Sequence, residues 1–161
     1  MLLEIKLAYD REDEVRNIFK EYTDMLVNMD KKFEESLKAQ KYDNELDDLT
    51  AKYGKPEGRL YLATIDGETA GCIALKKLDL SLSCELKRLY IKPKFRGNNI
   101  GEKLVNQIIC DAKDIGYKYI YLDTLPYLKS ALHIYKKWGF YEIEAYYNNP
   151  MEDAIYMKLD L

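Results

Sequence analysis

The chain has few cysteines, a single histidine and no long hydrophobic run, and these scarcities exclude several classes of protein. Its three cysteines, Cys72, Cys84 and Cys110, are an odd number at wide spacing. This pattern excludes a disulfide framework and provides no zinc-ligand spacing, so we expect three reduced thiols, mostly buried, and no metal site. The apolar runs are too short to span a membrane, and the N-terminus becomes charged too early for a signal peptide. We therefore expect a cytoplasmic protein.

Glycine and proline are also scarce. The chain contains 8 glycines and 4 prolines in 161 residues, and no repeat, low-complexity tract or linker divides it. Apolar residues make up 47% of the chain and charged residues 33%, as in soluble globular proteins. A chain of this length can bury a core without disulfides or metal ions. The sequence thus predicts a single domain over residues 1–161.

The chain has no general excess of positive charge. Its net charge is −3, but the segment KRLYIKPKFR, residues 87–96, contains five basic and no acidic residues. A local basic strip suits a small polyanionic ligand better than a long nucleic-acid track. Nucleic-acid binding is therefore the weakest functional hypothesis, and it would require an affinity for oligonucleotides that falls steeply with salt.

The N-terminal third predicts a strand followed by helices. The segment LLEIKLAY alternates as a strand does, and Asp10 can cap the helix that follows. That helix has one apolar stripe, formed by Val15, Ile18, Phe19, Tyr22 and Leu26. Between Asp30 and Tyr53 the apolar spacing is irregular, which indicates one or two short helices.

The middle of the chain predicts a hairpin and a bulged strand. The Asp-Gly pair at 66–67 lies between two strand-like runs and is typical of a type I′ turn. In the next strand, SCELKRLYIKP, the apolar residues Leu86, Leu89 and Ile91 are three and then two positions apart. One extra residue, a β-bulge near Arg88, would restore the alternation of a strand.

The C-terminal half predicts two helices and three strands. One helix runs from about Asn99 to Ile115, and Gly116 ends it. The segments YKYIYLDT, FYEIEAYY and AIYMKLDL predict strands, and YLKSALHIYKKW predicts a helix between the first two. The complete order is β-α-α-β-β-β-α-β-α-β-β. It indicates an α/β (α+β) fold with one mixed sheet, a bulged fourth strand and helices on the sheet's faces.

The segment FRGNNIGEKL, Phe95 to Leu104, predicts an anion site between a strand and a helix. A helix N-terminus exposes unpaired N–H groups and about half a positive charge. Gly97 and Gly101 let the backbone approach a ligand closely, and Arg96 adds a guanidinium. A P-loop is excluded because Gly-Lys-Ser/Thr is missing, and a dinucleotide fingerprint because its three glycines are missing.

This segment resembles the pyrophosphate turn of the GCN5-related N-acetyltransferases (GNAT). The family pattern Arg/Gln-x-x-Gly-x-Gly/Ala follows its fourth strand, and residues 96–101 read Arg-Gly-Asn-Asn-Ile-Gly. Asn99 replaces a glycine, and asparagine tolerates positive φ better than most residues. The segment ALHIYKKWGF resembles the family's Ala-x-x-x-Tyr-x-x-x-Gly-Phe, although Leu128 stands where the family often has asparagine. Short segments of the sequence are also similar to those of a small bacterial-type branch of the family, whose acceptors are unassigned.

The resemblance implies acetyl-CoA as the cofactor. Backbone amides of the turn would bind its pyrophosphate, and the preceding strand would pair with its pantetheine arm. The bulge would part this strand from the next and open a slot for that arm. The predicted cofactor-binding residues are Leu89, Tyr90, Ile91, Arg96, Gly97, Asn98, Asn99, Ile100, Gly101 and Glu102.

The resemblance also implies three catalytic groups. The backbone N–H of Leu89 would stabilise the oxyanion, and Tyr135 would protonate the departing thiolate. Glu85 lies four residues before Leu89, the offset at which some members place a glutamate base. We expect burial beside the cofactor to raise the pKa of Glu85 toward neutrality.

Each candidate has a structural alternative. Tyr135 shares an apolar stripe with other residues of its helix, so it can be a core aromatic. Glu85 can be a solvated strand carboxylate or a partner of Lys87. His133 is a weaker candidate base, because on a helix it lies about 200° around from Tyr135. On the acceptor side we expect the acidic helical region before Tyr53 and the residues Tyr146, Tyr147 and Asn149.

The main prediction is an acyltransferase that uses acetyl-CoA to acetylate an amine. No cysteine in the motifs is placed to act as a nucleophile, so we expect direct transfer in a ternary complex. The acceptor would be an amine of a small molecule or of a protein, with no nucleic acid or membrane partner, and the family resemblance is compatible with a homodimer. The alternative is a non-catalytic acyl-CoA-binding or regulatory module on the same fold, suggested by Asn99 and Leu128.

Overall fold

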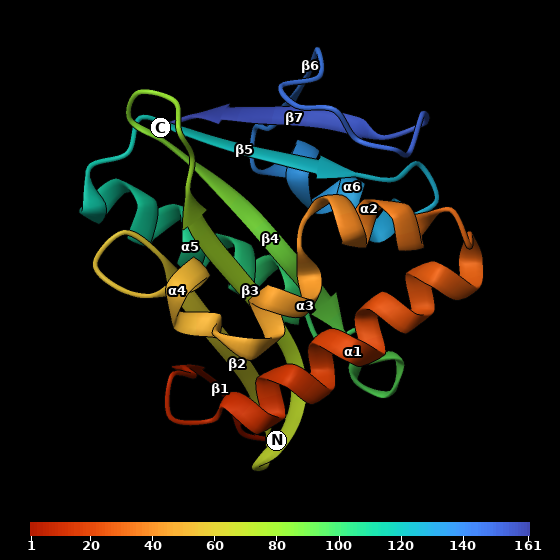
Figure 1. The fold of residues 1–161 in the computed structure, drawn as a ribbon. Helices are drawn as coiled ribbons and strands as arrows, with labels where there is room; N and C mark the ends of the chain where they lie inside the picture. The colour runs from red at the N-terminus through yellow and green to blue at the C-terminus, as the bar shows by residue number, and fades with distance from the viewer.

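The computed structural model describes residues 1–161 and contains one sheet of seven strands (Figure 1). In chain order the strands are β1 (Leu3–Leu7), β2 (Arg59–Ile65), β3 (Glu68–Lys77), β4 (Ser83–Ile91), β5 (Tyr119–Thr124), β6 (Tyr141–Ile143) and β7 (Ile155–Asp160). Their order across the sheet is β1-β2-β3-β4-β5-β7-β6. All neighbours run antiparallel except β4 and β5, which are parallel. The predicted mixed α/β sheet is confirmed.

Helices cover both faces of this sheet. They are α1 (Glu12–Met29), α2 (Phe33–Ala39), α3 (Tyr42–Asp47), α4 (Leu49–Tyr53), α5 (Ile100–Ile115) and α6 (Lys129–Lys137), with a 3₁₀ turn at Pro93–Phe95. The helices α1 to α4 lie in front of the sheet in Figure 1, and α5 and α6 lie behind it. The predicted helix at 99–115 and its end at Gly116, which has a φ of 109°, are confirmed.

Side chains of the central strands alternate between two hydrophobic cores. The core on the α5 side takes from β2 and β3 the residues Tyr61, Ala63, Ile73 and Leu75. The core on the α1 side takes from them Leu60, Leu62, Cys72 and Ala74. This alternation follows because successive side chains of a strand point to opposite faces. Each fully buried aliphatic side chain stabilises the fold by about 1.5–3 kcal/mol.

The hairpin and the bulge are both confirmed. Asp66 and Gly67 have φ values of 50° and 84°, and such paired positive φ values are typical of a type I′ turn. Arg88 has a φ of 61°, and the register of β3 against β4 shifts beside it. Leu86 lies in the core on the α5 side, and Leu89, beyond the bulge, packs against the same core. The extra residue thus keeps apolar side chains on one face.

The prediction of one or two short helices between Asp30 and Tyr53 is wrong, because three are present. Lys41 has a φ of 55° and therefore breaks the helical backbone between α2 and α3. The side chain of Asp48 accepts the N–H of Ala51 at 3.0 Å and starts α4. The chain therefore has four helices between its first two strands, where the predicted order had two.

Two further expectations fail locally. Asp10 does not cap α1, whose N-cap position is Arg11 and has no side-chain cap hydrogen bond. The acidic residues of the first turn, such as Glu14, stabilise this N-terminus instead. The strand predicted over FYEIEAYY ends at Ile143, because the chain leaves the sheet before Tyr146.

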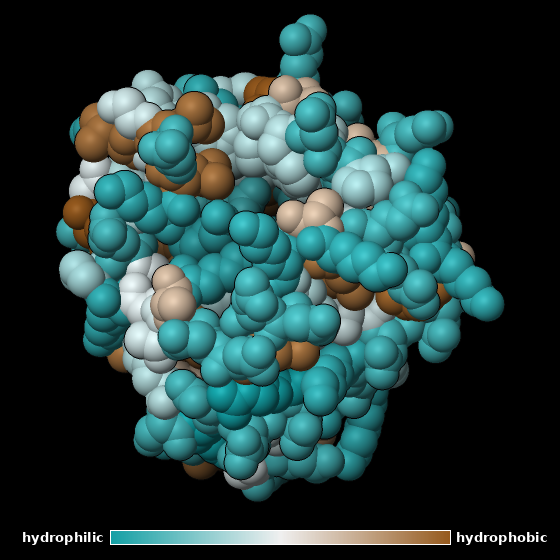
Figure 2. All heavy atoms as spheres, in the orientation of Figure 1, coloured by the Kyte–Doolittle hydropathy of each residue, from teal (hydrophilic) through white to brown (hydrophobic).

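The face of the molecule shown in Figure 2 is mostly hydrophilic. A hydrophobic patch near the C-terminus lies beside the β3–β4 connection, where Leu80 and Leu82 are 47% and 55% exposed. Two of the three thiols, Cys72 and Cys84, are buried, as expected, and Cys110 is exposed. No helix has both the length and the apolar character needed to cross a membrane.

Candidate active site

The strands β4 and β5 part in the middle of the sheet and leave a cavity of about 610 Å³ between them. Their pairing is confined to residues 83–85 of β4 and 119–121 of β5. Beyond Glu85 the bulge at Arg88 bends β4, so the two strands no longer pair. Ligands of α/β sheets commonly bind outside the carboxyl ends of neighbouring parallel strands. The predicted slot is therefore present at the expected position.

One end of the cavity is formed by the turn before α5. None of the six consecutive backbone amides from residue 97 to 102 donates to another backbone group. The first bond of the helix is from the N–H of Lys103 to the carbonyl of Asn99, at 3.2 Å. Free amides at a helix N-terminus are the donors that a pyrophosphate requires. The turn fits the anionic part of CoA.

Positive φ values shape this turn. Gly97 has a φ of 87° and Asn99 a φ of 58° with a ψ of 23°. Asn99 thus adopts the positive φ that asparagine was expected to tolerate at this position. A Cβ on Gly101 would lie 2.9 Å from Cδ1 of Ile134 in α6, so the glycine also lets α5 and α6 approach.

The predicted basic strip at 87–96 is wrong as an exposed surface. The bulge turns both Lys87 and Arg88 toward the helices on the α1 side, where they are 8% and 6% exposed. Lys94 pairs with Glu68 at 3.1 Å. Arg96, an exposed residue of the turn, donates from Nε to the carbonyl of Ile91 at 3.2 Å. A single guanidinium beside the free amides suits a small anion and gives no track for a nucleic acid.

Tyr135 lines the cavity from α6 and is 5% exposed. Its ring packs against Phe140 with 5.6 Å between ring centres. Burial raises the pKa of the Tyr135 hydroxyl above its ordinary value, and Tyr22 and Asp123 raise it further. The hydroxyl is therefore protonated at neutral pH, as a proton donor must be.

Leu89 follows the bulge and also lines the cavity. It lies beyond Glu85, the last residue of β4 that pairs with β5. The backbone of β4 is therefore accessible from the β5 side in this segment. On the rim, His133 is exposed on α6, and Leu128 lies before the start of that helix.

Glu85 lies close to the cavity but does not line it. It is 4% exposed, and its Oε2 accepts the hydroxyl of Tyr146 at 2.6 Å. Burial alone would raise the pKa of Glu85, but the charge of Lys87 and this hydrogen bond outweigh it and lower the pKa. The expectation of a raised pKa is wrong, because Lys87 lies only 3.5 Å from Oε1.

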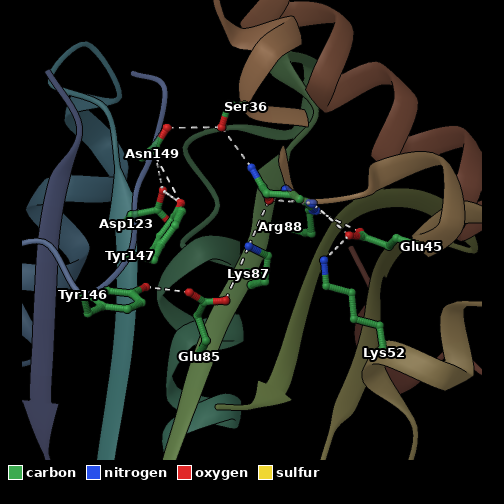
Figure 3. A network of polar contacts seen from close by, with 11 residues as sticks. Ser36, Glu45, Lys52, Glu85, Lys87, Arg88, Asp123, Tyr146, Tyr147 and Asn149 are labelled. Carbon is green, nitrogen blue, oxygen red and sulfur yellow. Dashed lines mark hydrogen bonds and ion pairs between the residues drawn. The ribbon is translucent and has the colours of Figure 1, made fainter. Parts of the chain in front are cut away.

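A polar network connects the bulge to the helices above it (Figure 3). Oε1 of Gln40 accepts from Lys87 and from Arg88, both at 3.0 Å. Arg88 also donates to both oxygens of Glu45, at 2.9 Å and 2.8 Å. Burial alone would raise the pKa of Glu45, but Arg88 and then Lys52 lower it to about 2.

The second half of the network holds the expected acceptor-side residues. Asp123 accepts from Tyr147 at 2.6 Å and from Asn149 at 2.8 Å. Asn149 in turn accepts from Ser36 of α2 at 3.3 Å. Asn149 lines the cavity, whereas Tyr146 and Tyr147 lie behind it and hold the carboxylates of Glu85 and Asp123.

Three residues of the cavity were missed by sequence reasoning. Tyr22 was expected to be a member of a core stripe, but it is half-buried and lines the cavity from α1. Gln40 follows α2 in a segment with weak periodicity. Asp123 stands at the end of β5, where the rule that ligands lie at the carboxyl ends of parallel strands could have indicated it.

Comparisons with known proteins agree with this geometry. The model of the Acetyltransferase (GNAT) family matches residues 14–140. An uncharacterized N-acetyltransferase of Schizosaccharomyces pombe is 36% identical over 98% of this chain and 92% of its own length. Another, of Dictyostelium discoideum, is 31% identical over the full length of both chains.

Solved structures have the same fold. An acetyltransferase from Streptococcus agalactiae superposes with a TM-score of 0.79 at 23% identity, over 99% of this chain and 98% of its own. The PaiA N-acetyltransferase from Thermoplasma acidophilum, solved with coenzyme A, superposes with a TM-score of 0.73 at 20% identity over all of both chains. The chain therefore belongs to the Acetyltransferase (GNAT) family and is an acetyltransferase.

Proposed function

We propose that the chain transfers the acetyl group of acetyl-CoA directly to an amine in a ternary complex. The observation that carries the proposal is the cavity between β4 and β5, with six free amides at one end and Tyr135 in its wall. Acetyl-CoA is the acetyl donor. Amides 97–102 and Arg96 would bind its pyrophosphate, and the segment from Leu89 to Ile91 would pair with the pantetheine arm.

Two groups of the chain would act on the thioester. The backbone N–H of Leu89 donates to the carbonyl oxygen as negative charge develops there. Tyr135 donates its phenolic proton to sulfur as the C–S bond breaks. The phenol recovers a proton from the amine nitrogen, which loses one as the N–C bond forms. No net proton is consumed when the amine enters neutral.

The cysteines support direct transfer. The cavity has no cysteine in its lining. Burial raises the pKa of Cys84 and of Cys72 well above the ordinary thiol value, so neither is a thiolate at neutral pH. Glu85 is paired and lies outside the lining, so we assign it the role of positioning Lys87 and Tyr146 rather than removing the proton of the amine.

The test compares Tyr135→Phe with wild type in thiol release from acetyl-CoA over a panel of amines. We expect the turnover number to fall about 10²- to 10⁴-fold, the range of general acid catalysis, with CoA affinity unchanged. The matched control is Tyr117→Phe, another buried tyrosine whose hydroxyl donates to the carbonyl of Glu57, at 2.7 Å, outside the cavity. Unchanged turnover in Tyr135→Phe removes this residue from the mechanism. Binding of acetyl-CoA without turnover on any amine would instead favour a non-catalytic module.

A further inference from the structure

The acceptor side of the cavity contains a carboxylate that the proposed reaction does not use. Asp123 lies on β5 beyond Tyr121, the last residue of that strand that pairs with β4. Its half-buried side chain lines the cavity. Tyr147 and Asn149 both donate to Oδ2, at 2.6 Å and 2.8 Å, and Figure 3 shows all three side chains together. Oδ1 therefore remains available to a ligand.

The other carboxylates near the cavity are already paired. Glu102 lines it at the turn of α5 but accepts two hydrogen bonds from Lys137, at 3.0 Å and 3.1 Å. Glu85 accepts from Tyr146, and Glu45 is held by Arg88. Asp123 is thus the carboxylate that can receive a cation on the acceptor side.

A hydrophobic wall stands next to Asp123. The residues of this wall line the cavity from α1, from α2 and from the segment after β5. They are Tyr22, Met25, Leu26, Met29, Phe33 and Leu125. Leu26, Phe33 and Leu125 belong to one buried cluster, and Tyr22 and Met25 pack against it. Methionine side chains adapt their shape to the ligand that they contact.

The polar side chains of Gln40 and Asn149, which line the cavity, are already bonded to each other through Ser36. Gln40 accepts from Lys87 and Arg88 and donates to Ser36 at 3.1 Å. Ser36 donates to Asn149, whose own amide nitrogen donates to Asp123. A second charge placed beside Gln40 or Asn149 would lose its water without gaining a free partner there, which is unfavourable.

We propose that Asp123 binds the ammonium group of the acceptor, and that the acceptor is a primary amine on an apolar body that packs against the wall. The inference rests on the proposed function and names its substrate class. The amine carries one positive charge and little other polarity. Oδ1 of Asp123 receives the N–H groups of the ammonium, while Tyr147 and Asn149 hold the carboxylate from behind. The ammonium loses one proton to solvent before its nitrogen attacks the thioester, so the amine that reacts is neutral.

The first test is calorimetric titration of phenethylamine into the CoA-saturated protein. Asp123→Asn should weaken amine binding about 10- to 100-fold, as expected for loss of a hydrogen-bonded charge pair. The affinity for CoA should not change. Asp111→Asn is the matched control, because Asp111 also accepts from a tyrosine, Tyr61, but lies outside the cavity. Equal amine affinity in Asp123→Asn and wild type overturns the assignment.

A second variant tests the wall without disturbing the core. Met29 is 55% exposed and lines the cavity, so Met29→Gln should fold normally. We expect it to bind phenethylamine several-fold more weakly and CoA as tightly as wild type, because apolar contact area is lost. Unchanged binding in this variant removes the wall from the acceptor site.

The acceptor class is tested by comparing three amines on the wild-type protein. Phenethylamine should bind at least tenfold more tightly than phenylalanine, which adds a carboxylate, and spermidine, which adds positive charges. Equal or tighter binding of either competitor, or no binding of phenethylamine, overturns the proposed class. Turnover of spermidine alone would keep the proposed function and reject this inference. Binding of phenethylamine without acetyl transfer would keep the inference and reject the function.

Discussion

Lys87 and Arg88 are consecutive in the chain, yet both side chains donate to the same oxygen, Oε1 of Gln40, at 3.0 Å. Neighbouring residues of a regular strand point to opposite faces. The positive φ of Arg88, 61°, breaks this alternation and turns both cations to the α1 side. The same bulge parts β4 from β5, so the opening of the cavity and the buried charge network have one cause.

The ion pair between Arg88 and Glu45 should be needed for stability. Their side chains are 4% and 1% exposed, so Arg88→Met leaves a buried carboxylate with only Lys52 as a partner. We expect the free energy of unfolding in urea to fall by about 3–5 kcal/mol. Lys94→Met is the control, since it removes an exposed pair worth about 0–1 kcal/mol. A loss as small as that of the control would contradict the importance of the buried pair.

Acid should destabilise the fold through Glu45. Its pKa falls from 4.5 to about 2 on folding, so its contribution is complete above pH 4.5 and disappears as the pH falls toward 2. At pH 3 about 2 kcal/mol of this contribution should be gone. The measurement is the free energy of unfolding at pH 6 and pH 3 in wild type and Glu45→Gln. Equal losses of unfolding free energy in both proteins would contradict this role of Glu45.

Asn99 should tolerate glycine and reject a β-branched residue. Its φ of 58° lies in the left-handed region, which costs an ordinary side chain roughly 1–2 kcal/mol. Asn99→Gly should bind CoA as tightly as wild type or more tightly, and Asn99→Val about tenfold more weakly. Each variant serves as the control for the other, and calorimetric titration with CoA measures the affinity of both. A marked weakening in Asn99→Gly would mean that the asparagine side chain itself contacts the ligand.

Glu85→Gln should retain most of the activity. Glu85 is paired with Lys87 and Tyr146 and does not line the cavity. We expect kcat/KM to change less than about fivefold, with the pH profile unshifted, because a positioning residue supplies no proton. Loss of the ascending limb of the profile in Glu85→Gln would instead establish this carboxylate as the general base.

The parts of the site that could be predicted from sequence are those whose signals are local. The Asp-Gly hairpin, the bulge near Arg88 and the turn at 96–101 each depend on the conformational preferences of a few adjacent residues. The irregular spacing of Leu86 and Leu89 sufficed to locate the bulge. The spacing of residues 30–53 carried no such signal, so the number of helices there was underestimated.

The charge environment could not be predicted, because it depends on contacts between distant segments. Glu45 and Arg88 are 43 positions apart and Glu85 and Tyr146 are 61 positions apart. Nothing near Glu85 in the chain indicates that Tyr146 donates to it. The expectation of a raised pKa considered only burial, whereas the charge of the nearby Lys87 and then the hydrogen bond from the distant Tyr146 reversed its sign.

Direct transfer of acetyl to an amine in one ternary complex can be tested by one rapid-quench experiment. The protein is mixed with labelled acetyl-CoA, with and without phenethylamine, and mass spectrometry follows the intact protein, free CoA and acetylated amine. We predict equal amounts of free CoA and acetylated amine when both substrates are present, and no acetylated protein at any time. An acetylated protein that precedes the product, or CoA release without acetylated amine, would contradict direct transfer.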